Sequence, residues 1–322
     1  MKALVTGGGG FLGGAIVRKL IARGDAVRSL TRSHYPWLAE LGVEQFAGDL
    51  TDIGQLIKAA GGCDVIFHVA AKAGVWGRKQ DFIDTNVTGT VNVITACRTA
   101  GIQKLVYTST PSVVHAGDDL EGADESLPYP SHFEAEYPRS KAEAEIAVLA
   151  ANDSSLCTVA LRPHLIWGPG DPHLIPRVIE RGRKGKLRRI GGKPILVDTT
   201  YVTNAANAHI LAADRLAPDA ACVGKAFFLS DDQPVNLWDF INEILAKHGI
   251  APVTKSIPVR RAMYAARLLE TVYRLLGLSA EPPLTRFVVS QLSTSHWFNI
   301  DAAKRDLGYL PEVTVAEGLK RL

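Results

Sequence analysis

Tyr137 and Lys141 form the pair of side chains in this sequence that is best suited to acid-base chemistry. They lie four residues apart in the segment YPRSK, so a helix would place both on one face. A phenol has a pKa near ~10 and is a poor acid or base at neutral pH, but a neighbouring ammonium group stabilises the phenolate and lowers that pKa. The pair is therefore suited to exchanging a proton with the oxygen of a carbinol or a ketone.

Three consecutive hydroxyl side chains precede this pair in the sequence. Thr108, Ser109 and Thr110 come at the end of an apolar run. If that run is a parallel strand, its carboxyl end lies at the edge of the sheet where ligands bind in open α/β folds. We expect a hydroxyl from this group to share a crevice with Tyr137 and Lys141.

A glycine-rich segment, TGGGGFLGG, follows the first apolar run of the chain. Gly7, Gly10 and Gly13 have GxxGxxG spacing, and a helical pattern begins at once. Glycines at these places allow a tight turn and a close approach of the backbone to a pyrophosphate, while the helix N-terminus contributes amides and a positive dipole. The segment predicts a dinucleotide cofactor.

The residues after the second apolar run indicate which dinucleotide this would be. NAD-binding proteins carry a carboxylate there for the ribose hydroxyls, whereas this chain has Leu30, Thr31 and Arg32, with Arg28 just upstream. Arginine can hold a phosphate through two parallel hydrogen bonds, so Arg32 favours NADPH and NADP+. Asp49, after the third run, is placed to hydrogen-bond adenine.

Short apolar runs alternate with helical patterns through the first half of the chain, which is typical of βαβ units stacked into a parallel sheet. We expect an α/β fold with a doubly wound parallel sheet of the Rossmann type and a smaller C-terminal substrate-binding domain. The NADP-binding domain would comprise residues 1–165, with a helix at 201–216 returning to it, and residues 166–322 would mainly bind substrate. Expected strands are 2–6, 26–30, 43–46, 65–68, 105–109 and 157–162, and expected helices are 11–23, 53–60, 87–100 and 137–151.

Composition excludes several other classes of protein. The chain has 322 residues, 47% of them hydrophobic and 21% charged, as a globular protein does and a disordered one does not. A net charge of +3 gives no reason to expect a nucleic-acid partner. The four cysteines lack ligand spacing, so we expect no metal and no disulfide framework. Without an apolar run long enough to span a membrane, the sequence predicts a cytoplasmic enzyme with a small-molecule substrate.

The order of glycine loop, hydroxyl group and Tyr/Lys pair resembles the extended short-chain dehydrogenases/reductases over essentially the whole chain. HVAA at 68–71, NVTGT at 86–90 and RPHLIWGPG at 162–170 resemble further segments of that superfamily. The resemblance implies that Thr110 faces the substrate, that Tyr137 is the acid-base group, and that Lys141 supports it and holds the nicotinamide ribose. Further cofactor contacts implied are Phe11, Leu12, Leu50, Ala70, Ala71, Ser109, Pro163, His164 and Asn86, although Asn86 would alternatively only tie a helix to a strand.

Within the superfamily the sequence most closely resembles the 3β-hydroxysteroid dehydrogenase-like branch. AAKAGVWG at 70–77, STPSVVHAGDDLEGADESLPYP at 109–130 and SQLSTSHWFNIDAAK at 290–304 are similar to the bacterial 2-alkyl-3-oxoalkanoate reductases of long-chain olefin and β-lactone biosynthesis. This resemblance implies NADPH-dependent reduction of a long-chain β-keto acid to the β-hydroxy acid. The expected partners are a hydrophobic substrate with a carboxylate, other enzymes of the same lipid pathway and a second copy of the chain.

Other functions stay open at this point. A 3β-hydroxysteroid or sterol-carboxylate dehydrogenase and an NAD-dependent sugar-nucleotide epimerase or dehydratase would share the motifs. For a sugar diphosphate the chain offers only the basic run 181–189, and we interpret that run as a solvated face. An NADP-sensing regulator would not need a hydroxyl, a tyrosine and a lysine in register.

The segment 259–276 has apolar residues interspersed with arginines. Three interpretations stay open for it: a lid, a membrane-surface helix or an ordinary packed helix.

Overall fold

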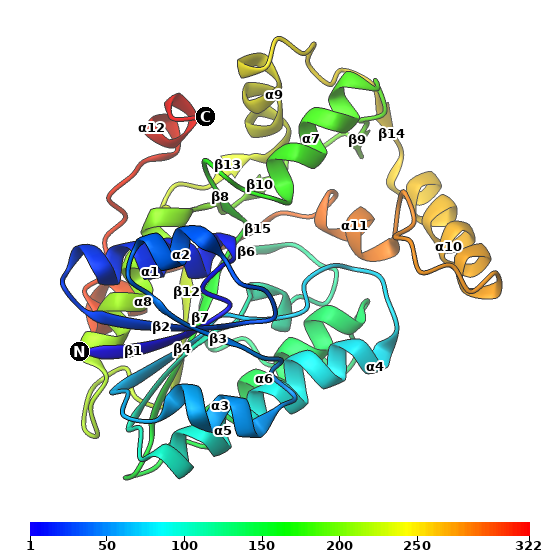
Figure 1. The fold of residues 1–322 in the computed structure, drawn as a ribbon. Coiled ribbons are helices and arrows are strands. Elements are labelled where there is room, and N and C mark those ends of the chain that lie inside the picture. The colour runs from blue at the N-terminus through cyan, green and yellow to red at the C-terminus, as the bar shows by residue number, and fades with distance from the viewer.

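A seven-stranded parallel sheet lies at the centre of the computed structural model, which describes residues 1–322 (Figure 1). Both faces of its middle strands are buried, as a parallel sheet requires. The predicted doubly wound α/β fold is confirmed. The strand order is β12 (Lys225–Leu229), β7 (Cys157–Pro163), β5 (Lys104–Thr108), β4 (Val65–His68), β1 (Lys2–Thr6), β2 (Ala26–Thr31) and β3 (Glu44–Ala47).

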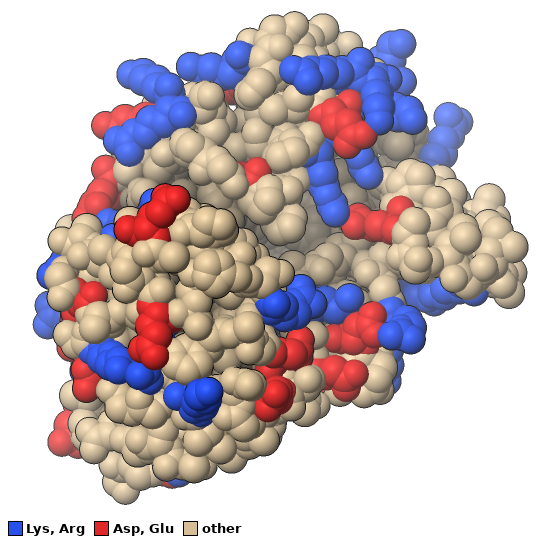
Figure 2. Space-filling model, in the orientation of Figure 1, with Lys and Arg blue, Asp and Glu red and all other residues tan.

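Helices cover the two faces of this sheet (Figure 1). On one face lie α1 (Phe11–Ala22), α2 (Pro36–Glu40) and α8 (Val202–Arg215), whose apolar side chains share one core with the strands. On the other face α3 (Ile53–Ala60), α5 (Gly89–Ala100) and α6 (Glu136–Ala150) form a second core. Because all seven strands are parallel, their carboxyl ends meet at one edge, where Figure 2 shows a hollow in the surface.

Most expected elements lie within one residue of their observed bounds, but strand β12 was not predicted. It pairs in parallel with β7 through Lys225–Leu229 at the edge of the large sheet. The helix expected at 201–216 is α8, and it packs on the same sheet. The large sheet therefore also contains a strand from the second half of the chain.

The helix expected at 87–100 has a different start. It is preceded by α4 (Lys79–Phe82) and by a π-helical turn, η1 (Ile83–Thr88), and α5 begins only at Gly89. Gly89 packs closely on the loop between β3 and α3, because a Cβ there would lie 2.7 Å from the Cβ of Leu50. The wider π turn carries Asn86, which is buried.

The remaining elements form a smaller region beyond the carboxyl edge of the large sheet (Figure 1). Its four-stranded sheet has the order β13 (Val235–Asn236), β10 (Leu196–Val197), β15 (His296–Phe298) and β6 (Leu120–Ala123), next to the pairs β11 (Thr200–Tyr201) with β8 (Ile166–Trp167) and β14 (Ser256–Ile257) with β9 (Arg189–Ile190). Its helices are α7 (Leu174–Arg183), α9 (Leu237–Lys247), α10 (Val259–Leu275), α11 (Arg286–Gln291) and α12 (Val315–Lys320), whereas the π-helical turn η3 (Ala303–Leu307) packs on α8 and β12 of the large sheet. Strand β6 comes from the half of the chain expected to bind the cofactor. None of the helices is both long and apolar enough to cross a bilayer.

A buried ion pair joins α6 to the large sheet. The Arg162 guanidinium on β7 donates to both carboxylate oxygens of Glu145 on α6, at 2.6 Å from Nη2 to Oε1 and 3.1 Å from Nε to Oε2. Both side chains are almost wholly buried, with 4% and 0% exposed. The Tyr129 hydroxyl donates a further hydrogen bond of 2.7 Å to Glu145. Such a pair is costly to break, because either partner alone would be a buried charge without compensation.

We expect Glu145→Gln to lower the free energy of unfolding by about 3–5 kcal/mol, because it leaves the Arg162 guanidinium buried and unpaired. Urea denaturation measures the change. The control is Glu180→Gln, which removes an exposed pair with Lys184 and should cost less than about 1 kcal/mol. Equal effects of the two substitutions would show that the buried pair contributes no more to the free energy of unfolding than the exposed pair does.

Candidate active site

The glycine loop lies between β1 and α1, and its conformation requires glycine at two positions. Gly7 has φ +72°, and a Cβ on it would lie 3.1 Å from the Cα of Ala70 at the end of β4. A Cβ on Gly13 would lie 2.2 Å from the carbonyl oxygen of Gly7. The loop, the first turn of α1 and the segment after β4 therefore pack closer together than other residues would allow.

The N-terminus of α1 has no capping side chain. Its N-cap is Gly10, no side chain accepts a hydrogen bond from the first turn, and no acidic residue lies in that turn. The amides of Phe11, Leu12 and Gly13 thus keep their donors for another acceptor, and the helix dipole favours an anion there. These residues fit the pyrophosphate of a dinucleotide.

Arg32 follows the carboxyl end of β2, and its side chain is exposed and has no hydrogen-bonding partner within the protein. Arg28 differs from it, because its guanidinium bonds to Glu44 and to the carbonyl oxygens of Ala59 and Gly61. Of the two arginines only Arg32 is available to a ligand.

Asp49 lies near Arg32, at the end of β3. Its Oδ1 accepts hydrogen bonds from the amide and the hydroxyl of Thr51, at 3.0 and 2.8 Å. The pKa of Asp49 is lowered, chiefly by the amide of Thr51 and in smaller part by the charge of Arg32. The carboxylate therefore stays ionised and remains an acceptor near neutral pH.

A chain of buried hydrogen bonds fixes the segment that contains Ala70 and Ala71. The Thr6 hydroxyl oxygen accepts from the amides of Val69 and Ala70, at 3.1 and 3.2 Å, so its proton points to Nδ1 of His68, 2.9 Å away. Nε2 of His68 then donates to Thr90, 3.0 Å away. Burial lowers the pKa of His68 to about 3, so this ring stays neutral and structural.

Asn86 ties two parts of the site together. Its side chain accepts from the amide of Lys72 at 2.7 Å and donates to the carbonyl oxygen of Lys72 at 3.1 Å. It also donates to the hydroxyl of Ser140 on α6 at 2.9 Å. The segment after β4 is thereby joined to the helix that carries Tyr137 and Lys141.

Lys141 reaches the carboxyl end of β5. Its Nζ donates to the carbonyl oxygen of Thr108 at 2.6 Å and lies 4.1 Å from the centre of the Tyr107 ring. Burial lowers the pKa of Lys141 to about 7, and the charge of Glu145 opposes that shift in part. The side chain thus changes charge near neutral pH.

Tyr137 is half-buried at the start of α6, and its environment differs from the one expected. Burial raises the pKa of Tyr137, and a side-chain hydrogen bond with Thr110 opposes the shift. The sequence-based expectation that Lys141 lowers this pKa is wrong for the protein alone, because the Lys141 ammonium bonds to the Thr108 carbonyl instead. The phenol therefore stays protonated at neutral pH.

The three hydroxyls at the end of β5 have different surroundings. Thr110 caps the short 3-10 helix η2 (Pro111–Val113) by accepting from the amide of Ser112 at 3.3 Å, and it also acts to lower the pKa of Tyr137. Thr108 bonds to Nε2 of His209 on α8 at 2.8 Å, so it holds the sheet to a helix. Ser109 has a buried hydroxyl without a partner in the protein. Thr110 is thus the hydroxyl that the fold brings to Tyr137.

The chain matches the model of the 3-beta hydroxysteroid dehydrogenase/isomerase family over residues 4–259. The chain belongs to this family. It is 52% identical over 325 residues to a 2-alkyl-3-oxoalkanoate reductase of Stenotrophomonas maltophilia, with 100% of this chain and 98% of the relative covered. It is also 38% identical over 325 residues to the decarboxylating sterol-4-alpha-carboxylate 3-dehydrogenase of Mus musculus, with 99% and 89% covered.

The fold has a solved counterpart in the UDP-glucose 4-epimerase of Thermus thermophilus in complex with NAD. The TM-score is 0.74 at 25% identity, with 100% of this chain and 97% of the epimerase covered. The predicted resemblance to the 3β-hydroxysteroid dehydrogenase-like branch is confirmed, and the chain is an oxidoreductase of an NAD(P)-dependent family.

In this member of the 3-beta hydroxysteroid dehydrogenase family, His164 belongs to a group of three histidines that sequence reasoning did not find. Nε2 of His296 donates to the carbonyl oxygen of Gln291 at 3.0 Å, so its Nδ1 accepts from Nε2 of His164 at 2.8 Å. His115 lies edge-on to His296. Burial lowers the pKa of all three rings, that of His115 to about 4. They are joined only by folding, since they are far apart in the sequence.

These histidines lie beside the turn that follows Thr110. With Pro111 and Ser112, which directly follow Thr110, they line a cavity of about 10 Å³. Pro163 ends β7 immediately before His164. The start of the segment 162–170, which resembles a segment of the superfamily, is therefore packed against the turn that follows Thr110.

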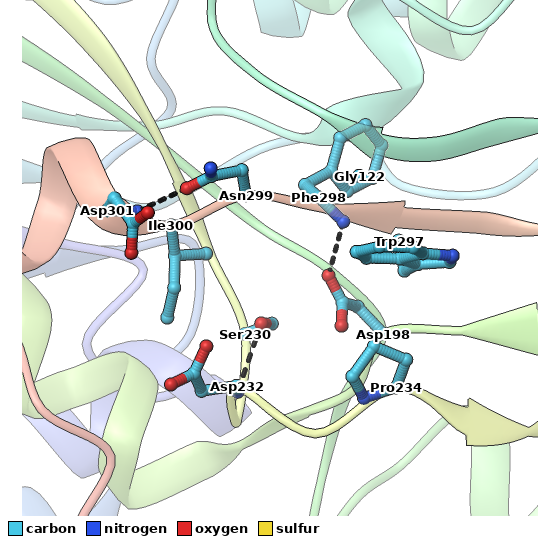
Figure 3. A pocket seen from close by; sticks show the side chains of 10 residues that line it. All are labelled: Gly122, Asp198, Ser230, Asp232, Pro234, Trp297, Phe298, Asn299, Ile300 and Asp301. Carbon is cyan, nitrogen blue, oxygen red and sulfur yellow. Dashed lines mark hydrogen bonds between the residues drawn. The ribbon is translucent and has the colours of Figure 1, made fainter.

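A larger cavity of about 310 Å³ lies between β15 and the turn after β12 (Figure 3). Asp198, Asp232 and Asp301 contribute carboxylates to it, and burial raises the pKa of Asp198 to about 7. Asp198 accepts a hydrogen bond of 2.8 Å from the amide of Phe298. None of the residues predicted from the sequence to bind cofactor or substrate lines this cavity.

The depressed pKa of Lys141 predicts a dependence of stability on pH. The unfolded chain binds a proton at this residue up to about pH 10.5, whereas the folded chain releases it near pH 7, so this contribution to stability rises with pH between those values. From pH 7 to pH 9 the free energy of unfolding should rise by roughly 2 kcal/mol more in the native protein than in Lys141→Met. Urea denaturation at both pH values measures the difference. Identical pH dependence in the two proteins would contradict the assignment.

Proposed function

We propose that the protein reduces a long-chain 2-alkyl-3-oxoalkanoic acid to the 3-hydroxy acid with NADPH. The observation that carries this proposal is 52% identity, over its whole length, to a reductase of that name. The position of Thr110 close enough to Tyr137 to influence its pKa supports the proposal, because the two hydroxyl groups could then approach one carbonyl oxygen. The same resemblance supports a role in the lipid metabolism that forms long-chain olefins, in which other enzymes of the pathway are partners.

The cofactor would lie along the carboxyl edge of the large sheet. The close packing of Gly7 and Gly13 and the uncapped start of α1 fit its pyrophosphate, and the exposed Arg32 fits a 2′-phosphate. NADPH would supply the hydride that the ketone carbon receives. The residues proposed to hold it are Gly7, Gly10, Phe11, Leu12, Gly13, Arg32, Asp49, Leu50, Ala70, Ala71, Asn86, Ser109, Tyr137, Lys141, Pro163 and His164.

Tyr137 is proposed as the general acid of the reduction. Its raised pKa keeps the phenol protonated at neutral pH, which is the form that can give a proton to the oxygen of the ketone. Thr110 would orient that oxygen through its hydroxyl. Lys141, whose ammonium group is fixed at the Thr108 carbonyl, would hold the nicotinamide ribose.

The substrate side of the site would come from the region beyond the sheet edge. Residues 1–165 are proposed mainly to bind the cofactor, and residues 166–322 mainly to bind the substrate.

The second candidate function is a dehydrogenase of sterol carboxylates or 3β-hydroxysteroids, which the 38% identical mouse relative favours. Both reactions exchange hydride at a carbon that carries oxygen, so the same three residues would serve either. A homodimer and a cytoplasmic location stay predictions.

Tyr137→Phe should lower turnover by roughly two to four orders of magnitude, because general acid catalysis has that effect on rate. The dissociation constant for NADPH, measured by fluorescence titration, should change little. Thr110→Val should also reduce turnover, whereas Thr110→Ser keeps the hydroxyl and should retain much of it. The control is Tyr264→Phe at an exposed tyrosine of α10. Near-normal turnover in Tyr137→Phe would reject the assigned role.

Arg32→Ala should weaken NADPH binding about ten- to a hundredfold and leave NADH binding nearly unchanged, because only NADPH has a 2′-phosphate. Dissociation constants from fluorescence titration measure both. Arg183→Ala, at an exposed arginine of α7, removes the same charge elsewhere and should affect neither. Equal loss for both cofactors would indicate that Arg32 acts on the fold rather than on the phosphate.

The substrate class predicts a dependence on chain length. Burial of an apolar chain contributes ~0.8 kcal/mol for each methylene, so kcat/KM should rise about fourfold per methylene until the site is full. The measurement is NADPH-dependent reduction along a series of 2-alkyl-3-oxo acids, beside oxidation of 3β-hydroxysteroids and sterol carboxylates. A flat length profile, or oxidation of the steroids without reduction of the keto acids, would favour the second candidate instead.

A further inference from the structure

Helix α10 exposes a stripe of large apolar side chains to solvent. Leu275 is 82% exposed, and Tyr264 and Leu268 are each 66% exposed. These three lie on one face of the helix at spacings of four and seven residues, with Val272 beside them and Leu276 and Leu278 at the C-terminal end. A contiguous exposed patch of this kind is unusual on a soluble surface and marks a binding face.

A row of arginine side chains runs along the helix beside the apolar stripe. Arg260, Arg267 and Arg274 repeat every seven residues, so they form a row along one flank, and all three are exposed. The helix has one acidic residue, Glu270, which is turned inward, is 6% exposed and bonds to Arg286 at 2.8 Å. The outward face therefore combines apolar side chains with arginines, and it has no acidic side chain.

From these observations we propose that α10 binds the surface of a lipid bilayer that contains anionic lipid. With 17 residues and four arginines the helix is too short and too charged to span a membrane, and it suits a position along the boundary of headgroups and acyl chains. The apolar stripe would enter that boundary, and the arginines would contact lipid phosphates. In Figure 1 the helix projects at one end of the molecule, and Figure 2 shows that end as largely uncharged, with basic side chains above and below it and acidic side chains on the side of the hollow.

A second copy of the chain fits this face less well than a bilayer does. Two α10 helices packed through their stripes would bring arginine rows together without an exposed carboxylate on either helix to compensate them. Like charges brought together at an interface oppose association. A surface rich in phosphate supplies the missing negative charge along the whole row.

The C-terminal end of α10 is joined to the candidate site. The indole of Trp76 donates to the carbonyl oxygen of Leu278 at 3.1 Å, and its ring lies edge-on to Tyr273 at 6.2 Å. Trp76 belongs to the segment that follows β4 and contains Ala70 and Ala71. Binding of α10 to a bilayer would thus hold the cofactor edge of the sheet close to the lipid, from which an apolar molecule can enter without crossing water.

The test uses the full-length protein and sedimentation with two kinds of vesicle, one of phosphatidylcholine alone and one of phosphatidylcholine with phosphatidylglycerol. We expect the protein to pellet with the anionic vesicles, and binding to fall with added salt because it depends in part on charge. Leu268→Ser with Leu275→Ser should reduce the bound fraction more than tenfold. Arg260→Glu with Arg267→Glu should do the same.

Two control pairs match these variants in chemistry. Ile146→Ser with Leu310→Ser removes exposed apolar residues on other elements, and Lys184→Glu with Lys186→Glu reverses two exposed charges in the basic run. Both should bind vesicles like the native protein. All variants change exposed side chains, so circular dichroism should show native folding in each.

A second measurement locates the contact. The four native cysteines are buried, so an added Leu268→Cys can be labelled selectively with a polarity-sensitive dye, and Leu310→Cys serves as its control. The dye at residue 268 should shift to the blue with anionic vesicles and the dye at residue 310 should not. Failure to bind anionic vesicles, equal loss in the control pairs, or conversion of a dimer to a monomer by Leu268→Ser with Leu275→Ser without any vesicle binding would each overturn the proposal.

Discussion

Two buried basic side chains, Arg162 and Lys141, fix the orientation and the axial position of helix α6 on the sheet. The candidate site depends on this restraint. Arg162 fixes Glu145 through three hydrogen bonds, and Lys141 bonds to the end of β5. Residues four apart on a helix share a face, so positions 141 and 145 also determine where Tyr137 lies. The result is a phenol beside Thr110 that does not depend on a flexible loop for its position.

The same burial that positions these groups also sets their proton affinities. It lowers the pKa of Lys141 and raises the pKa of Tyr137, so the phenol stays protonated while the amine titrates near neutral pH. A reductase needs a protonated acid, and this arrangement supplies one without an ion pair between the two side chains. The rule that an adjacent ammonium acidifies a phenol failed because the ammonium has a nearer acceptor in the Thr108 carbonyl.

The large sheet, the glycine loop and the Tyr/Lys pair could be predicted from sequence because each has a local pattern. A run of apolar residues marks a buried strand, and glycine spacing marks a turn that a Cβ would block, as at Gly13. Strand β12 and the pairing of β6 with β15 could not, since short strands paired over long separations have no local signal. The histidine group of His115, His164 and His296 was missed for the same reason. Arg32 was chosen over Arg28 from its place after the second strand, and the structure adds that Arg28 is bonded to Glu44 and to a backbone carbonyl.

The central claim is that this member of the 3-beta hydroxysteroid dehydrogenase family reduces the 3-keto group of a 2-alkyl-3-oxo acid. The most direct measurement supplies such an acid with NADPH that carries deuterium at its transferable position, and analyses the product by mass spectrometry. We expect a 3-hydroxy acid that has one deuterium on carbon 3 and keeps its carboxyl group. A product without deuterium, or unchanged keto acid under conditions in which a 3β-hydroxysteroid or a sterol carboxylate is oxidised, would contradict it.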